Sequence, residues 1–175
     1  MATFKIDAAH SEIGFKVKHL MISNVSGVFK KFDATIESEK EDFSDSKITF
    51  EADVDSINTQ DEARDGHLKG DDFFNAEQYP KIKFVSTGIE KRADNEYSVT
   101  GDLTIRDVTK PVVLNVDYNG TVTDPWGQVK AGFEITGKIS RKEYNLKWNA
   151  LTEAGGMVVG DDVKLHMNVE VQKQA

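Results

Sequence analysis

The sequence contains no cysteine, so it offers no disulfide, no thiolate nucleophile and no thiolate metal site. No apolar run approaches the roughly 20 residues that a membrane-spanning helix needs, so no stable membrane insertion is expected. Basic residues are in the minority, with 22 Lys and Arg against 30 Asp and Glu and a formal net charge of -8. This charge argues against nucleic acid as a partner, because a phosphate backbone selects for clustered Lys and Arg. It argues equally against docking on anionic membrane surfaces.

What remains is the composition of one ordinary folded domain. Hydrophobic residues make up 38% and charged residues 30%, which is typical of a soluble protein that folds. With 175 residues the chain can bury a sizeable core, so we expect a single domain over residues 1–175. Strand-like alternation starts at once, without an apolar signal segment, which predicts a cytoplasmic protein. A periplasmic location is the alternative if a leading segment has been removed.

Apolar and polar residues alternate with a period of two along much of the chain, and this predicts strand after strand. Ile13, Phe15 and Val17 alternate with glycine and lysine, and the longest alternation covers residues 129–139. At Lys30-Lys31 the phase shifts, which predicts a β-bulge. The pattern as a whole predicts an all-β fold of about eight antiparallel strands. An up-and-down barrel and a sandwich would both satisfy it.

One long stretch between two strand patterns has helical features. Residues 59–62, with the sequence TQDE, fit the capping box, which predicts a helix N-cap at the threonine. The helix should run for about two turns and stop at Gly70. Phe73 and Phe74 then follow on a short turn, and two adjacent aromatic residues must be buried. We therefore expect a helical insertion over about residues 59–80 that packs on the open end of the β structure.

Several motifs that follow one another in order carry a resemblance to a known family. They are IDAAHSEIGFKVKH, VSGVFKKFDATI, RDGHLKGDDFFNAEQYPKIKF, VTGDLTIRDVTKPVVL and GGMVVGDDVKL. With these motifs the chain resembles the YceI-like family, the lipocalin-like polyisoprenoid-binding proteins, along nearly its whole length. The resemblance implies an eight-stranded lipocalin-like barrel and so decides against the sandwich. It also implies a cavity that holds a long isoprenoid or acyl chain.

Whether the barrel is hollow depends on the volume of its inward side chains. The inward phase mixes large side chains with small residues, namely Ala34, Ala52, Gly101, Ala131 and Gly137. The pattern allows a dry channel if the small residues share one level, or a solid core if each lies opposite a large side chain. The resemblance favours the channel. The ligand-binding residues predicted inside it are Phe15, Val17, Phe32, Phe50, Ala52, Phe74, Phe84, Leu103, Leu114, Ala131, Phe133 and Trp148.

Such a barrel needs no catalytic group, because each buried methylene contributes roughly 0.8 kcal/mol to binding. The expected function is non-catalytic binding, transport or storage of an isoprenoid quinone, a polyisoprenoid or a fatty-acyl compound, and such a lipid would be the co-purifying guest. His19, Arg64, Asp65 and Arg141 are the candidate polar groups at the mouth. Arg64 and Asp65 could equally anchor the insertion to the barrel rim. The alternative function is an enzyme that acts on such a lipid, with a mouth histidine as general base.

Metal and catalytic motifs are absent from the sequence. The 4 histidines show no metal-binding spacing, and His67 with Asp65, Asp71 and Asp72 is the cluster closest to a metal site. We expect these carboxylates to cap the helix and turn, with no bound metal and no covalent cofactor. There is no nucleophile elbow, phosphate loop or dinucleotide fingerprint, so no enzyme is expected. The sequence leaves a homodimer open as the assembly.

Overall fold

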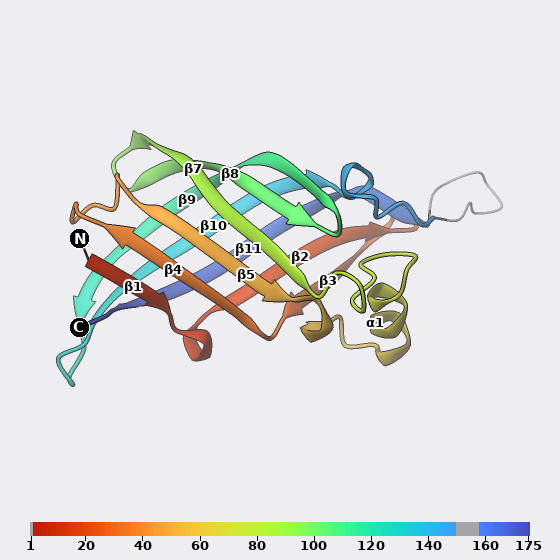
Figure 1. Ribbon diagram of the computed structural model, residues 1–175, viewed down its shortest axis with the longest axis horizontal. Coiled ribbons are helices and arrows are strands. Elements are labelled where there is room, and N and C mark those ends of the chain that lie inside the picture. The colour runs from red at the N-terminus through yellow and green to blue at the C-terminus, as the bar shows by residue number, and fades with distance from the viewer. Residues whose placement is uncertain (1, 150–157) are drawn as a thin grey trace.

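The computed structural model describes residues 2–149 and 158–175, which form a closed antiparallel β-barrel with a helix beside one end (Figure 1). The strands are β1 Ala2–Ile6, β2 Glu12–His19, β3 Ser23–Phe29, β4 Phe32–Ser38, β5 Lys47–Asp53, β6 Ile57–Asn58, β7 Lys81–Ala93, β8 Glu96–Ile105, β9 Val108–Thr123, β10 Val129–Ser140 and β11 Val159–Lys173. The helices are α1 Glu62–Lys69 and the 3-10 turns η1 Ala8–His10, η2 Val54–Ser56 and η3 Arg141–Tyr144. No helix within these ranges is long and apolar enough to cross a membrane. Gly155 and Gly156 of the last motif lie outside the described residues.

These strand segments make eight barrel strands because the first three barrel strands are each broken once. β1 continues into β2, β3 into β4 and β5 into β6, so that β2 pairs with β3 while β1 pairs with β4. Every later strand pairs with the next one along the chain. β11 closes the ring, because it pairs with β1 at one end and with β2 at the other. The predicted antiparallel barrel of about eight strands is confirmed.

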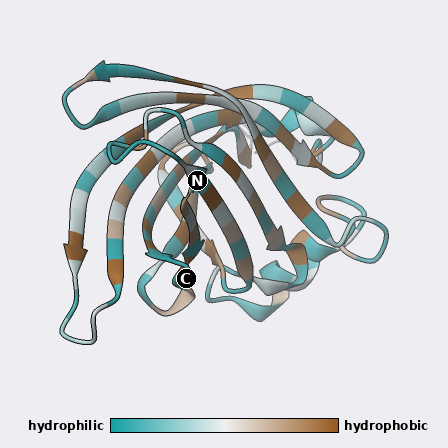
Figure 2. Cartoon of the chain, turned by 60° about the vertical axis from the view of Figure 1, so that its left-hand side comes forward, coloured by the Kyte–Doolittle hydropathy of each residue, from teal (hydrophilic) through white to brown (hydrophobic). Residues whose placement is uncertain are grey.

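Hydropathy alternates along the barrel strands (Figure 2). Several inward side chains of β9 and β11 are only half-buried. Val112, Leu114 and Val116 in β9 are half-buried, whereas the residues between them are exposed. Leu165 and Met167 in β11 follow the same pattern. In a close-packed core such side chains would have no accessible surface left. Their remaining exposure faces a space inside the barrel, which they line.

Two strand breaks are braced by hydrogen bonds that replace the missing ladder bonds. Where β1 leaves β11, the Glu170 N–H donates to Ser11 Oγ at 3.0 Å and the Asp7 N–H donates to the Glu170 carbonyl at 2.8 Å. Between β3 and β4 the structure has a full break at Lys30-Lys31, where the sequence predicts only a bulge. Because η2 interrupts the neighbouring strand at the same level, the Lys30 N–H can donate to the Ser56 carbonyl at 3.2 Å.

α1 begins later than its sequence predicts. The N-cap is Asp61, whose carboxylate accepts from the Arg64 N–H at 3.0 Å, so the predicted cap at Thr59 is wrong. Thr59 is only 4% exposed, and buried polar groups need partners. Its N–H and its hydroxyl donate to Asp65 Oδ1 at 2.9 and 2.6 Å. The helix ends at Lys69 with Gly70 as its C-cap, as predicted.

Phe73 and Phe74 attach the insertion to the end of the barrel. Phe73 is 6% exposed, and its ring centroid lies 5.0 Å from that of His67 and 5.6 Å from that of Trp148. Phe74 is half-buried, and its ring stands perpendicular to Phe29 at 6.1 Å. Both rings also line the space inside the barrel. The insertion therefore forms part of the cavity wall.

We expect Phe73→Ala to lower the free energy of unfolding by about 3–5 kcal/mol, because it removes a buried ring. Phe74→Ala should cost clearly less, because part of the Phe74 ring already faces open space. Urea denaturation of both variants beside the parent protein measures the two losses. Equal losses, or a larger loss for Phe74→Ala, would contradict this packing of the two rings.

Candidate functional site: the cavity of the barrel

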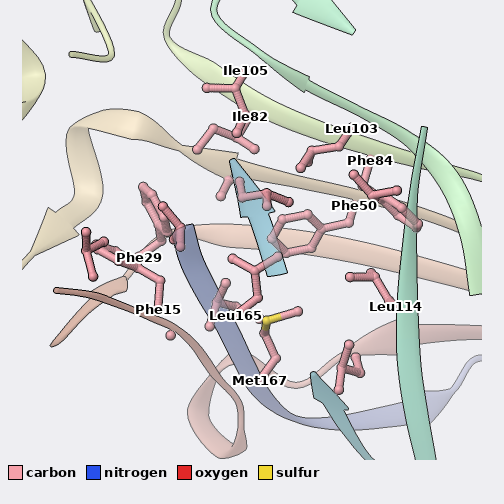
Figure 3. Close-up of a pocket in the computed structure, with 18 of the residues that line it drawn as sticks. Phe15, Phe29, Phe50, Ile82, Phe84, Leu103, Ile105, Leu114, Leu165 and Met167 are labelled. Atoms are coloured by element: carbon pink, nitrogen blue, oxygen red, sulfur yellow. The ribbon is translucent and has the colours of Figure 1, made fainter. Parts of the chain in front are cut away.

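A cavity of about 610 Å³ occupies the inside of the barrel. Its lining reaches from Phe43 and Tyr97 near one end to His19 and Arg64 at the other. Figure 3 shows side chains from facing strands that point into it, and those labelled there are all hydrocarbon except for the sulfur of Met167. Such a surface can bind an apolar guest by burial but offers few directional contacts.

Most of the residues predicted from the sequence to line the cavity do so. They are Phe15, Val17, Phe50, Ala52, Phe74, Phe84, Leu103, Leu114, Phe133, Trp148, His19 and Arg64. Phe32 does not, and packs against the core at the start of β4. Ala131 does not either, because it is 1% exposed in a cluster with Phe4 and Phe43. A period of two tells which face a residue takes, but not how far along the barrel axis it lies.

The small inward residues play two different roles. A methyl group added at Gly101 would lie 2.4 Å from the Phe84 ring, and one added at Gly137 would lie 2.6 Å from Leu114. These two glycines therefore make room for a large side chain on the adjacent strand, as a solid core would require. Ala34 and Ala52 line the cavity instead. The free space of the cavity therefore lies next to the two alanines, because the space above the two glycines is already filled by Phe84 and Leu114.

Phe43 closes one end of the cavity, and the sequence analysis did not single it out. It lies in the loop between β4 and β5, has a φ of 64°, and is 4% exposed. Its ring centroid is 5.0 Å from that of Phe4 and 5.2 Å from that of Phe133. The hydroxyl of Ser38 donates to Asp45 in the same loop at 2.7 Å, and this bond lowers the pKa of Asp45 to about 2. The sequence signal that could have identified Phe43 is its position as a single aromatic residue in an otherwise charged loop.

At the other end, the mouth, α1 is held by the side chains of Arg64 and Asp65. Arg64 Nε donates to Thr59 Oγ1 and Arg64 Nη2 donates to the Thr59 carbonyl, both at 2.8 Å. Thr59 in turn donates to Asp65. These contacts fit the anchoring role that the sequence left open for both residues. The Arg64 side chain nevertheless contributes to the cavity lining.

Arg141 is a buried cation at the mouth, with 2% of its surface exposed. Burial lowers its pKa, whereas the carboxylate of Asp161 raises it. The guanidinium joins the segment after η3 to the start of β11. It donates to the backbone carbonyls of Leu146 at 2.5 Å, Trp148 at 2.8 Å, Gly160 at 2.8 Å and Val159 at 3.2 Å. Arg141 therefore holds irregular backbone in place around the opening.

The carboxylates predicted to surround His67 have separate partners. Asp65 accepts from Thr59, and Asp71 Oδ1 lies 3.2 Å from Arg106 Nη2. Only Asp72 approaches His67, with its Oδ2 atom 2.9 Å from Nε2 of the ring. The group therefore does not converge on one point. None of its carboxylates caps the helix as expected, because the N-cap is Asp61, whereas the contact of Asp65 with Thr59 fits the anchoring role.

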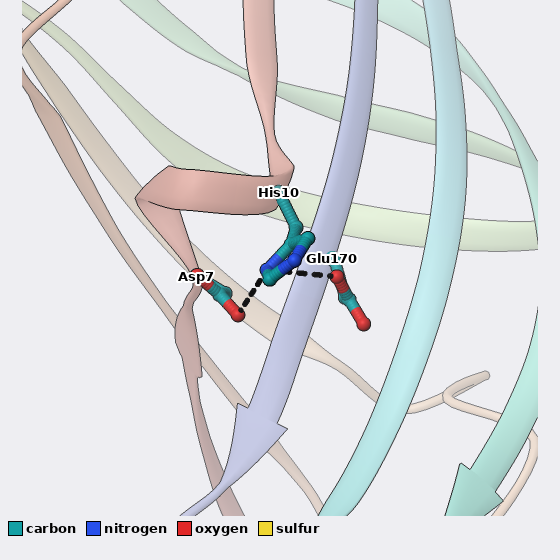
Figure 4. A group of neighbouring side chains, drawn as sticks. All are labelled: Asp7, His10 and Glu170. Atoms are coloured by element: carbon teal, nitrogen blue, oxygen red, sulfur yellow. Dashed lines mark hydrogen bonds and ion pairs between the residues drawn. The ribbon is translucent and has the colours of Figure 1, made fainter. Parts of the chain in front are cut away.

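Asp7, His10 and Glu170 form a different cluster, on the outside of the barrel at the η1 break (Figure 4). His10 Nδ1 lies 2.9 Å from Asp7 Oδ2 and 3.6 Å from Glu170 Oε2. One imidazole and two carboxylates would suit a metal ion. However, Lys130 Nζ lies 2.8 Å from the same Asp7 oxygen and supplies the positive charge. Hydrogen bonds from Lys130 and then His10 lower the pKa of Asp7 to about 2. Glu170 lies far from the other two in sequence, so local spacing could not reveal the cluster.

Asp7→Asn should therefore lower stability in a pH-dependent way. The pKa of Asp7 is about 2 in the fold against 3.8 ordinarily, so its contribution is fully present above about pH 4 and lost as the pH falls toward 2. We expect a loss of about 1–2 kcal/mol at neutral pH, because the group is partly exposed, and a smaller loss at pH values near 2. Urea denaturation across this range measures it. Asp33→Asn, at an exposed carboxylate 3.7 Å from Lys5, is the control, and a loss for Asp7→Asn that does not change with pH would contradict the ion pair.

Comparison with known proteins places this barrel among others of the same kind. A UPF0312 protein of Staphylococcus aureus strain USA300 is 40% identical over 171 residues, which is 97% of each chain. Among solved structures, BcnA of Burkholderia cenocepacia superposes with a TM-score of 0.82 at 25% identity, covering 94% of this chain and 98% of its own. The YceI protein of Campylobacter jejuni superposes with a TM-score of 0.76 at 35% identity, covering 97% and 96%.

A more distant solved structure shares the fold. It is a polyisoprenoid-binding domain from Saccharophagus degradans, with a TM-score of 0.68 at 16% identity and 98% of each chain covered. The model of one family, the YceI-like domain, matches residues 4–171. With nearly the whole barrel inside that match and a relative that is 40% identical, this chain belongs to the YceI-like family.

Proposed function

We propose that this protein binds one long apolar lipid chain inside its barrel, without catalysis, and carries or stores it. The observation that carries the proposal is the cavity, whose walls are formed by hydrocarbon side chains from facing strands (Figure 3). Binding gains favourable free energy when an apolar chain replaces the empty space or the water in an apolar cavity of this kind. No reacting group is needed for that gain.

The volume of the cavity limits the size of the guest. Since a water molecule takes up about 30 Å³, a cavity of about 610 Å³ has room for about 20 groups of that size. A methylene is of similar size, so a chain of about 20 carbons would fill the space. Phe43 closes the far end, and a longer chain would have to project from the mouth.

The two arginines at the mouth leave few donors for recognition of a headgroup. Arg141 donates to four backbone carbonyls. Arg64 donates to the hydroxyl oxygen and to the carbonyl of Thr59. We infer that the guest is selected mainly by length and apolar character, because burial alone discriminates poorly between chains of one size. A fold neighbour known as a polyisoprenoid-binding domain supports an isoprenoid chain as one candidate beside a fatty-acyl chain. Mass spectrometry of an organic extract from the purified protein would identify it.

An enzyme is the second candidate, because His67 and Asp72 form a pair beside the mouth. A histidine oriented by a carboxylate can act as a general base on an ester or similar group of a bound lipid. Turnover of a chromogenic fatty ester that His67→Ala abolishes would favour this alternative. Binding of the same ester in a one-to-one ratio without turnover would favour the carrier.

A series of fatty acids of increasing length tests the proposed cavity. Affinity should rise with length, by at most about 0.8 kcal/mol per methylene, because ordering the chain offsets part of each gain. The rise should stop near about 20 carbons, where the cavity is full. Titration calorimetry measures the affinities. An affinity that does not depend on length would contradict binding inside the barrel.

Two alanine positions provide a matched pair of substitutions. Ala34→Phe should fill the channel and lower the affinity for long chains more than about tenfold, because Ala34 is half-buried and lines the cavity. Its melting temperature should change little, since the ring enters existing space. Ala131→Phe should instead destabilise the fold by about 1–3 kcal/mol, because Ala131 is 1% exposed in the packed closed end.

Lipid titration and thermal melting of both variants separate the two effects. Unchanged binding by a folded Ala34→Phe variant would show that the ligand lies elsewhere. Ala52 also lines the cavity but is 1% exposed, so Ala34 is the better position for the test.

A further inference from the structure

The turn between β2 and β3 presents three consecutive apolar residues to solvent beside the mouth of the cavity. Leu20, Met21 and Ile22 are 39%, 55% and 83% exposed. The turn lies at the same end of the barrel as α1 (Figure 1). The Leu20 N–H donates to the carbonyl of Val158 at 2.8 Å, and Val158 lines the cavity. We call Leu20 to Ile22 the apolar tip.

The backbone of the apolar tip is unfavourable for its side chains. Leu20 and Met21 have φ values of 54° and 62°, in the left-handed region that bulky residues rarely adopt. Asn-Gly satisfies a turn of this kind with far less strain. The chain therefore keeps bulky apolar side chains in a conformation that costs free energy and leaves them exposed. Folding alone does not account for that choice, whereas contact with an apolar partner would.

A row of lysines crosses the outer wall of the barrel next to the apolar tip. Lys16 in β2 lies directly opposite Lys164 in β11, and Lys164 lies directly opposite Lys138 in β10. Lys18 follows Lys16 on the same face of β2 and lies about 7 Å from the tip, two residues at about 3.4 Å each. It also borders the cavity at the mouth. Like charges opposite one another destabilise a sheet. We call these four residues the lysine row.

Acidic residues neutralise only part of the lysine row. Asp162 lies 3.7 Å from Lys138, in an exposed pair. Among the described residues no ion pair joins Lys16, Lys18 or Lys164 to a carboxylate. His166, the next outward residue of β11, pairs with Glu134 at 3.5 Å. This face is locally basic although the chain as a whole carries a net charge of -8, because a net charge is an average over the entire surface.

We propose that the apolar tip and the lysine row dock the mouth of the cavity reversibly on an anionic lipid bilayer. The apolar side chains would enter the boundary between headgroups and acyl chains, as the apolar faces of interfacial segments do. The lysines would bind anionic headgroups while their aliphatic stems lie along the surface. The wall formed by β10, β11 and β2 then tilts toward the membrane. The docking is peripheral and inserts no segment across the bilayer.

This inference rests on the proposed function, because a long apolar chain has little solubility in water. A mouth that meets the bilayer lets the chain pass from one apolar phase to another without crossing water. The opposite end of the barrel offers a contrast. Trp126, in the turn between β9 and β10, is 82% exposed, but Asp124 is its charged neighbour in that turn and Lys130 is paired with Asp7. Exposed apolar surface and unpaired lysines coincide at the mouth.

The experiment is co-sedimentation of the lipid-free protein with vesicles of phosphatidylcholine, with and without phosphatidylglycerol. The parent protein should bind the anionic vesicles and be released by salt. Ile22→Asp, and separately Lys16→Glu combined with Lys164→Glu, should each lower the bound fraction about tenfold or more. Trp126→Asp is the matched control and should bind like the parent protein. All three variants alter exposed positions, so their folds should be intact, and circular dichroism checks this.

The results test the docking surface separately from lipid binding in the cavity. If the parent protein does not bind, if the mouth variants bind normally, or if Trp126→Asp weakens binding as much as Ile22→Asp, the docking surface is wrong. Binding equal on neutral and anionic vesicles would overturn the role of the lysine row. Titration of the same proteins with a soluble fatty acid, without vesicles, tests the cavity. Fatty-acid binding without docking would overturn only this inference, and docking without fatty-acid binding would overturn only the proposed function.

Discussion

Closure of the sheet around a space that its side chains do not fill is the constraint on which the rest of the structure depends. A barrel of eight strands is just wide enough to be packed solid or to hold one small ligand. Here most inward side chains of β9 and β11 stay half-buried, so the wall lacks packing partners on one side. The fold tolerates this deficit because every barrel strand has two hydrogen-bonded neighbours. Backbone pairing holds the ring, and the interior is free to accept a guest.

The two ends of the ring are finished by different means. Phe43 packs aromatic rings across one end, so that end gains the burial the middle lacks. At the mouth, irregular backbone is held by the guanidinium groups of Arg141, which is buried, and Arg106, which is half-buried. Arg141 binds carbonyls of the segment after η3 and of the start of β11, and Arg106 Nη1 donates to the carbonyls of Asp71 and Phe73 in the insertion. Carbonyls that no strand can pair are satisfied this way, which keeps the opening from collapsing into the cavity.

Much of the fold could be predicted from the sequence, because strand alternation is a local property. The barrel itself required the family resemblance, since alternation alone also allows a sandwich. Contacts between distant residues escaped prediction. Ala131 has the right face but lies at the level of Phe43, and Thr59 looks like a helix cap until its burial against Asp65 is known. Asp7, His10 and Glu170 meet only because β1 and β11 are neighbours in the closed ring.

The proposed binding of a lipid chain inside the cavity also bears on how that chain must arrive. Burial in a hydrocarbon wall is strong but unselective, and a chain of about 20 carbons leaves such a wall slowly, because every methylene must be exposed to water on the way out. A protein that works by burial alone therefore needs a means to lower that cost at the point of delivery. An apolar surface at the mouth is such a means, since it shortens the path through water. In this barrel the exposed turn at Leu20 to Ile22 provides that apolar surface. The neighbouring lysine row orients the contact, which hydrophobic burial by itself cannot do.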